Sequence, residues 1–217
     1  MDFAIGQARS TDASLLADIC LLADPGTFEF LLGGLKPGTR AGDILSCLCG
    51  AEGISYSFRY FALARRDREI LGGYNAIPSD ELRSLDENLA TALKGKAGLG
   101  NVAVLRWFTR RIRLAWRSDA MAAPGGALVV ANIAVFPQFQ GQGIGKRLIT
   151  HAIDEAQAGG LDSVCLFVWA ERSQAIGLYR KMGFEVVGTA PFRPHKLLPY
   201  RARHLMRFDC HKAPATE

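Results

Sequence analysis

The fold of this chain is decided by the stretch Gln140-Gly141-Gln142-Gly143-Ile144-Gly145-Lys146. It follows an apolar run, residues 128–135, and precedes a segment whose apolar residues recur at helical spacing. Glycines allow the backbone to approach a ligand closely, and the start of a helix adds unpaired N–H groups and the positive end of its dipole. The stretch therefore predicts an anion site shaped for a pyrophosphate, with an ordinary glycine-rich turn as the alternative.

The spacing of the glycines separates this loop from two other phosphate-binding loops. A P-loop requires glycine where this chain has Gln140, and serine or threonine where it has Arg147, so the hydroxyl that holds Mg²⁺ is missing. A dinucleotide fingerprint counted from Gly141 would need its third glycine one place later than Gly145. A nucleoside triphosphatase and a Rossmann dehydrogenase are both disfavoured.

A second motif follows about thirty residues downstream. Residues 173–181 have helical spacing, with Ser173 as a candidate N-cap and Gly183 where a helix end tolerates left-handed backbone. An apolar run of strand length, residues 164–169, lies between the two motifs. A strand, a helix and a strand in this order place the glycine loop at the carboxyl end of a parallel strand, where α/β sheets bind ligands.

Together the two motifs resemble those of the GCN5-related N-acetyltransferase (GNAT) family. The first family motif, Gln-x-x-Gly-x-Gly, is matched by Gln140, Gly143 and Gly145, and Gly141 is an additional permissive residue. The second is roughly Asn-x-x-Ala-x-x-Leu-Tyr-x-x-x-Gly-Phe, and it is matched by Ala175, Leu178, Tyr179, Gly183 and Phe184. Arg172 occupies the position of the motif asparagine, so the contact that the asparagine makes with the cofactor is not carried over to this chain.

The resemblance implies an α/β (α+β) fold with a mixed, largely antiparallel sheet, a central parallel strand pair and helices on both faces. We expect one GNAT-like domain over residues 1–217. The predicted strands are residues 3–8, 56–64, 69–77, 128–135, 164–169, 184–188 and 200–208, and a helix is expected after a cap at residues 10–12.

A helical insertion at about residues 79–124 departs from the simplest family pattern. Leucines 82, 85, 89 and 93 predict one amphipathic helix after Ser79. A second apolar stripe comprises Leu105, Phe108, Ile112 and Trp116, backed by Arg106, Arg110, Arg113 and Arg117. We expect this layer to pack on the sheet or on a second subunit, which makes a homodimer an open alternative. A membrane surface or an anionic partner is the less favoured interpretation.

Composition limits the other possibilities. The net charge of +5 and pI near 9.1 suit a polyanionic cofactor, and no nucleic-acid reader motif accompanies them. The five cysteines are irregularly spaced, which predicts free thiols and no metal site. Neither a leader segment nor an apolar run of roughly 18 residues is evident, so we expect a cytoplasmic protein that makes no membrane contact.

The resemblance also implies a chemistry, namely acetyl transfer from acetyl-CoA to a primary amine of a small molecule or protein by direct attack. In the family the pyrophosphate is held by N–H groups, here those of residues 140–146 including Gln142, Ile144 and Lys146, and Arg172 could meet a phosphate. The pantetheine arm would pair with the open edge of the fourth strand at Ile133 and Val135. Val135 or a neighbour would donate to the oxyanion, and Tyr179 would protonate the departing thiolate.

The residue that accepts the proton of the amine is not determined by the sequence. Asn132, the one polar side chain in the predicted fourth strand, could position a water or could instead satisfy a backbone group at a bulge. Glu29 or His195 could face the acceptor, but nothing singles out one of the three. Because the base and the family's asparagine are both unassigned, an inactive acyl-CoA-binding sensor or interaction module is the alternative to an enzyme.

Overall fold

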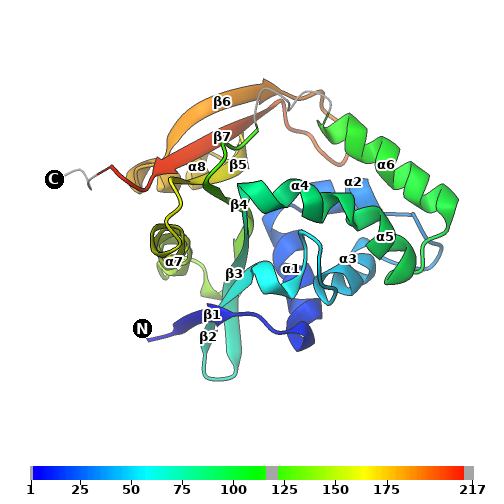
Figure 1. Cartoon of the computed structure of the whole chain (residues 1–217), viewed down its shortest axis with the longest axis horizontal. Coiled ribbons are helices and arrows are strands. Elements are labelled where there is room, and N and C mark those ends of the chain that lie inside the picture. Colours follow the sequence, from blue (N-terminus) through cyan, green and yellow to red (C-terminus); the bar gives the residue numbers. More distant parts are fainter. Residues whose placement is uncertain (1, 116–121, 213–217) are drawn as a thin grey trace.

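The computed structural model describes residues 2–115 and 122–212, and Figure 1 shows their arrangement. One seven-stranded sheet has the order β1-β2-β3-β4-β5-β7-β6. Only β4 and β5 run parallel, and the other neighbours are antiparallel, as the resemblance predicts. The strands are β1 (Ala4–Gln7), β2 (Phe61–Arg66), β3 (Glu69–Pro78), β4 (Ala127–Val135), β5 (Ser163–Trp169), β6 (Glu185–Pro191) and β7 (Ala202–Asp209).

Helices cover both faces of the sheet. Neighbouring residues of β3 show the two sides, because a side chain at Gly73 would meet Ile19 of α1 (Ala13–Ala23), whereas Tyr74 reaches His151 of α7 (Ile144–Ala158). Helices α2 (Pro25–Leu32) and α3 (Ala41–Cys49) pack with α1, and α8 (Ser173–Lys181) shares a hydrophobic core with α7. Each face therefore has its own core.

The hairpin of β2 and β3 forms as predicted, except that its first strand starts late. Residues 56–60 were expected to be strand, but Phe58–Tyr60 is a 3-10 turn. The Ser57 side chain accepts a hydrogen bond from the N–H of Arg59, and this local bond competes with strand pairing.

Strand β4 is the middle strand of the sheet and contains a bulge. Asn132 lies opposite Asn75 and Val130 lies opposite Ala76, so Ala131 is an extra residue that forms a β-bulge. The pairing of β4 with β5 ends at Val130 and Leu166. Beyond the bulge the two parallel strands separate, which leaves the edge of β4 open, as the resemblance implies.

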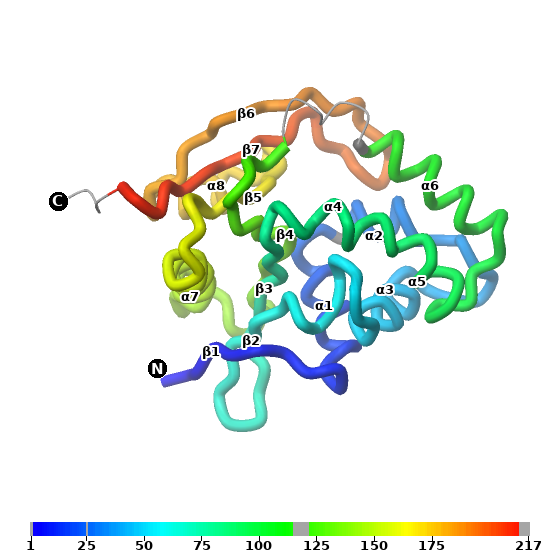
Figure 2. Tube along the Cα trace, viewed as in Figure 1, coloured from blue at the N-terminus to red at the C-terminus, as the bar shows by residue number. Residues whose placement is uncertain are grey.

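The insertion contains three helices rather than the predicted two: α4 (Ser79–Glu87), α5 (Leu89–Gly95) and α6 (Asn101–Ala115). The single helix expected over leucines 82–93 breaks at Asn88, whose Nδ2 donates to the carbonyl of Gly53. Helix α4 contacts β3 and β4, but α5 and α6 pack on α3 and α2, away from the sheet (Figure 2).

The stripe predicted on α6 does not pack on the sheet, so of the two expected packing partners only a second subunit stays a prediction. Leu105, Phe108 and Ile112 are exposed by 62%, 51% and 42%, whereas Val104 and Trp107 are buried. The expected stripe therefore faces solvent, and the residues next to it face α2 and α5. Trp116 and Arg117 lie outside the described residues.

Helix α8 ends as the sequence predicts, but its N-cap differs. Gly183 has a φ of +93°, as the end of α8 requires, but Arg172 and not Ser173 is the N-cap, and it makes no side-chain cap bond. All five cysteines are free. In the described part of the chain no helix is long and apolar enough to span a bilayer, and no three His, Cys, Asp or Glu residues cluster as metal ligands would.

Candidate active site

The glycine loop connects β4 to α7 and presents its backbone to solvent. Gly141 and Gly143 have φ values of +76° and +77°, a conformation that other residues rarely adopt. Gly143 is the N-cap of α7, so the N–H groups of Ile144, Gly145 and Lys146 have no acceptor within the helix. A Cβ added at Gly141 or Gly143 would meet no atom within 4 Å, so the glycines serve the backbone conformation and leave the loop open.

The predicted loop residues contribute in different ways. The side chain of Ile144 is buried in the core beneath α7, so only its amide can face a ligand. Gln142 and Lys146 are exposed. Gln140 is exposed as well, but its Nε2 donates to the main-chain oxygen of Val135 at 3.0 Å. The side chain of Gln140 thus fixes the loop to β4.

The edge of β4 beyond the bulge is open toward β5. The N–H of Phe136 donates to the oxygen of Leu71, and Val135 is paired with Gly72. Hydrogen-bonded and non-hydrogen-bonded pairs alternate in an antiparallel ladder, so the peptide groups of Ile133 and Val135 point away from β3. The bond from Gln140 to the oxygen of Val135 agrees with this direction.

A cavity of about 160 Å³ fills the separation between β4 and β5. Residues 130–133 and 166–169 form its two sides. Ala23 and Asp24, at the end of α1, line it on one face of the sheet, whereas Ala175 and Tyr179 of α8 line it on the other. The gap therefore joins the two faces of the sheet.

Tyr179 lies in this cavity as an almost buried side chain, 8% exposed. Among the described residues, none forms a hydrogen bond with its hydroxyl. Burial raises the pKa of Tyr179 to about 12, so the hydroxyl keeps its proton throughout the neutral range. A protonated hydroxyl in the gap can donate to a group that enters there.

Sequence comparison supports the assignment that the geometry suggests. A family model described as an acetyltransferase (GNAT) domain matches residues 58–186, which is more than half of the chain. The chain belongs to the GNAT family.

The more similar relatives match only part of this GNAT chain. The [ribosomal protein bS18]-alanine N-acetyltransferase of Escherichia coli K12 is 45% identical over 53 residues, which cover 24% of this chain and 36% of the relative. The chain thus matches about a third of the length of such curated relatives.

Solved structures share the fold over nearly the whole chain. An N-acetyltransferase from Staphylococcus aureus Mu50 superposes with a TM-score of 0.65 at 18% identity, covering 94% of this chain and 99% of that one. A Bacillus subtilis acetyltransferase in complex with CoA gives 0.54 at 16% identity, covering 96% and 99%. At these identities the likeness shows the GNAT fold alone.

Arg172, which replaces the asparagine of the second GNAT motif, also lines the cavity. Its Nη2 donates to the Tyr200 hydroxyl at 2.9 Å, and its guanidinium lies 5.7 Å from the centre of the Tyr200 ring. The Arg172 side chain is exposed and directed to the loop before β7, so a contact with a phosphate stays a prediction.

Of the three residues considered for removing the amine proton, only Asn132, which could position a water, is in the cavity, where it is 7% exposed. Glu29 is exposed and lines a different pocket beside α3. His195 packs against Phe30, with ring centres 5.0 Å apart, in another pocket. Since neither pocket includes the gap between β4 and β5, the structure gives no support to Glu29 or His195.

Sequence reasoning missed Asp24. Its carboxylate accepts hydrogen bonds from Trp169 Nε1 at 3.0 Å and from the Thr27 hydroxyl at 2.7 Å, and it lines the cavity. A signal was present, because Asp followed by proline marks a capped helix start, and Asp24 is the N-cap of α2. The sequence does not show that Asp24 belongs to the site, because its partner Trp169 lies 145 residues away along the chain.

Proposed function

We propose that this GNAT protein transfers an acetyl group from acetyl-CoA to a primary amine by direct attack. The observation that carries the proposal is the continuity of three features: the exposed N–H groups at the start of α7, the open edge of β4, and the cavity that crosses the sheet. Gln140 and Val135 join the first two, and Ile133 lines the third. A pyrophosphate, an amide-containing arm and a thioester would meet these features in that order.

The residues present fit such a cofactor. The amides of residues 143–146 would bind the pyrophosphate, helped by the dipole of α7. The outward peptide groups of Ile133 and Val135 would pair with the amides of the pantetheine arm. We assign the N–H of Val135 or a neighbour to the thioester oxygen, on which charge develops.

When bound, acetyl-CoA supplies a thioester carbon with which the amine nitrogen forms a bond while the carbon–sulfur bond breaks. We assign Tyr179 to give its proton to the sulfur; the support is that its hydroxyl is protonated, lines the gap and has no competing partner in the described chain.

The amine must approach from the α1 face and lose a proton. Asp24 is the one carboxylate among the described residues that line the gap, and we assign it to attract and deprotonate the ammonium group. Asn132 of β4, which lines the same cavity, would orient the amine or a water that carries the proton onward.

Calorimetry with acetyl-CoA, followed by detection of released thiol with a panel of primary amines, tests the proposal. We expect acetyl-CoA to bind and at least one amine to release CoA. Binding without release for any amine would support the inactive acyl-CoA-binding module instead. Absence of acetyl-CoA binding would exclude both.

Two expectations about context stay predictions. A cytoplasmic location would be checked by fractionation of cells that express the chain. A homodimer would use the exposed face of α6, where Leu105, Phe108 and Ile112 form an apolar stripe. Light scattering of the purified protein measures the mass directly, and a monomer would contradict this use of the stripe.

A further inference from the structure

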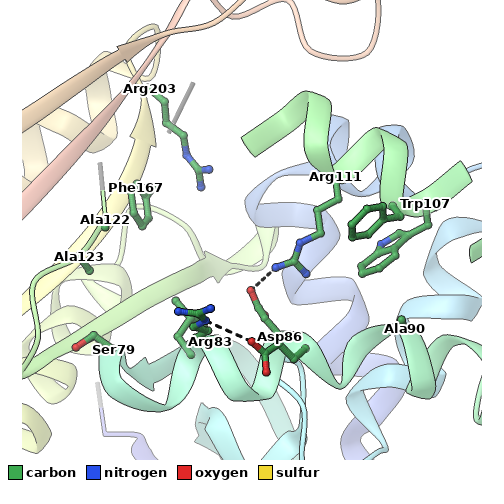
Figure 3. A pocket seen from close by; sticks show the side chains of 13 residues that line it. Ser79, Arg83, Asp86, Ala90, Trp107, Arg111, Ala122, Ala123, Phe167 and Arg203 are labelled. Carbon is green, nitrogen blue, oxygen red and sulfur yellow. Dashed lines mark hydrogen bonds and ion pairs between the residues drawn. The ribbon is translucent and has the colours of Figure 1, made fainter. Parts of the chain in front are cut away.

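A larger cavity of about 770 Å³ lies next to the gap, on the side from which the amine would enter. It is bounded by α4, α6 and the side chains of Phe167 and Arg203 on β5 and β7 (Figure 3). A third cavity of about 240 Å³, lined mostly by leucine and aromatic side chains together with the Arg111 and Asp86 pair, opens beside it. Arg203 lines all three cavities, so its guanidinium lies where they meet.

The charges that line the larger cavity are paired except at Arg203. Arg111 bonds to Asp86 at 2.6 Å and Arg83 bonds to Glu87 at 3.3 Å. Within residues 2–115 and 122–212, no carboxylate lies within 4 Å of Arg203 and no acceptor bonds to it. Figure 3 shows its side chain pointing from β7 into the cavity, across from the Arg111 and Asp86 pair.

Arg203 lies over two aromatic rings. Its guanidinium carbon lies 4.8 Å from the centre of the Phe167 ring and 5.5 Å from that of Trp169. Trp169 is itself fixed, because it donates to Asp24 and stacks on Tyr200. A cation–π contact does not use up the N–H donors of the guanidinium, so these donors remain available to a group that enters the cavity.

An unpaired guanidinium in such a place calls for an anion. Burial lowers the pKa of Arg203 and the nearby Asp24 carboxylate opposes that shift, but an arginine keeps its charge at neutral pH. A partly desolvated charge without a counterion is costly, whereas a carboxylate can take two parallel hydrogen bonds from the fork of an arginine.

The 240 Å³ cavity adds a second requirement. Its walls are mostly leucine and aromatic side chains of α2, α3, α5 and α6, among them Leu45, Leu93 and Trp107. An apolar group of a few carbon atoms that starts near Arg203 would fit within it, against these side chains.

We propose that the acceptor is a primary amine that carries a carboxylate, with Arg203 as the carboxylate-binding residue. The amine would face Asp24 and the gap, and an apolar side group would enter the 240 Å³ cavity. A free amino acid with an apolar side chain has these three groups on one carbon. The inference rests on the proposed acetyl transfer and names its substrate class.

Matched amines test the inference. Leucine, leucinamide and 3-methylbutylamine share the apolar group and the amine, but only leucine has the carboxylate. We expect kcat/KM for leucine to exceed that for the other two by about 10-fold or more, as for a hydrogen-bonded charge pair. The corresponding aminophosphonate distinguishes the two anions, and a preference for it over leucine would overturn the carboxylate assignment.

Substitutions then assign the effect to Arg203. Arg203→Met should reduce the preference for leucine over leucinamide to less than about 3-fold, because it removes the donors and keeps an apolar stem. Arg207→Met is the matched control, since Arg207 is exposed on the same face of β7, opposite Cys165, and lines none of the three cavities. It should keep the wild-type preference.

If Arg203→Met does not fold by circular dichroism, Arg203→Lys decides, because it keeps the charge and loses the fork. An unchanged preference in whichever variant folds would overturn the inference.

A binding measurement separates this inference from the proposed catalysis. In the presence of CoA, N-acetylleucine should bind the wild-type protein about 10-fold more tightly than N-acetylleucinamide. Equal affinities would overturn the role of Arg203 even if other amines are acetylated. Conversely, tighter binding of N-acetylleucine than of N-acetylleucinamide, with no thiol released from acetyl-CoA, would support the carboxylate site and contradict the proposed acetyl transfer.

Discussion

Gln140 donates from its side chain to the main-chain oxygen of Val135 across 3.0 Å, and this bond links the glycine loop to the open edge of β4. The loop and the edge are the two places where the proposed cofactor would be held. Their relative position therefore depends in part on one side-chain amide. The glutamine of the motif therefore stabilises the position of the loop through its hydrogen bond to β4.

Replacing Gln140 with leucine should weaken acetyl-CoA binding by about 3- to 10-fold, because one hydrogen bond of about 1 kcal/mol no longer fixes the loop. Calorimetry measures the change. Gln138→Leu is the control, since Gln138 is exposed in the preceding turn, and its affinity should match the wild type. Equal affinities for both variants would show that the loop keeps its position without the bond.

Gly143→Ala should lower acetyl-CoA affinity by about 10-fold or more. Alanine at a φ of +77° is strained by about 1 kcal/mol, and its Cβ would stand where the proposed pyrophosphate approaches the backbone. Gly160→Ala is a matched control, because Gly160 has a φ of +68° after the other end of α7 and is also free of neighbours. Both variants should lose similar stability in urea unfolding, but only Gly143→Ala should lose affinity.

The sequence was sufficient to predict the central elements because their burial is local information. Strands β4 and β5 are apolar on both faces, and α7 has one buried stripe that includes Leu148 and Ala152. These patterns are complete within each segment. The bulge at Ala131 is different, because it exists only relative to the register of β3. Asn132 signalled an irregularity without locating it.

Features that depend on distant partners could not be predicted in this way. Helix α6 has two apolar stripes, and its contacts with α2 and α5 decide that Trp107 is buried and Phe108 exposed. Arg203 meets Trp169 only because β7 inserts between β5 and β6. Neither pairing leaves a local trace in the sequence of the segment concerned.

Tyr179→Phe should lower kcat on any accepted amine by about 100-fold and leave the acetyl-CoA affinity close to wild type, as expected for loss of a general acid. Because the pKa of Tyr179 is raised to about 12, its hydroxyl stays protonated up to about pH 10. The pH dependence of the rate below pH 10 should therefore be the same in the wild type and in the variant. Steady-state kinetics from pH 6 to 10 checks both points. Full activity in the variant would remove the acid role.

The free energy of unfolding should decrease above pH 10. A tyrosine in the unfolded chain ionises near pH 10, whereas Tyr179 in the folded protein keeps its proton until about pH 12. Its contribution, about 2 to 3 kcal/mol, is therefore complete below pH 10 and lost as the pH rises to 12. Burial also raises the pKa values of Tyr56 and Tyr74, which adds to the same trend.

Urea unfolding at several pH values from 8 to 11 measures this decrease. Tyr179→Phe should show a shallower decrease than the wild type, because its share is removed. A stability that is constant up to pH 11 in the wild type would contradict the burial of these hydroxyls.

Arg110→Met should destabilise the packing of α6 on α2 without changing acetyl-CoA affinity. The Arg110 guanidinium donates to the carbonyl oxygens of Gly33 at 2.8 Å and Leu31 at 3.3 Å, which lie at the end of α2 and have no helical partner. Their loss should lower the free energy of unfolding by about 1 to 2 kcal/mol. Arg113→Met, at an exposed position of α6, should unfold like the wild type. Reduced acetyl-CoA affinity in either variant would place the insertion in the cofactor site, which the distance of α6 from the glycine loop argues against (Figure 1).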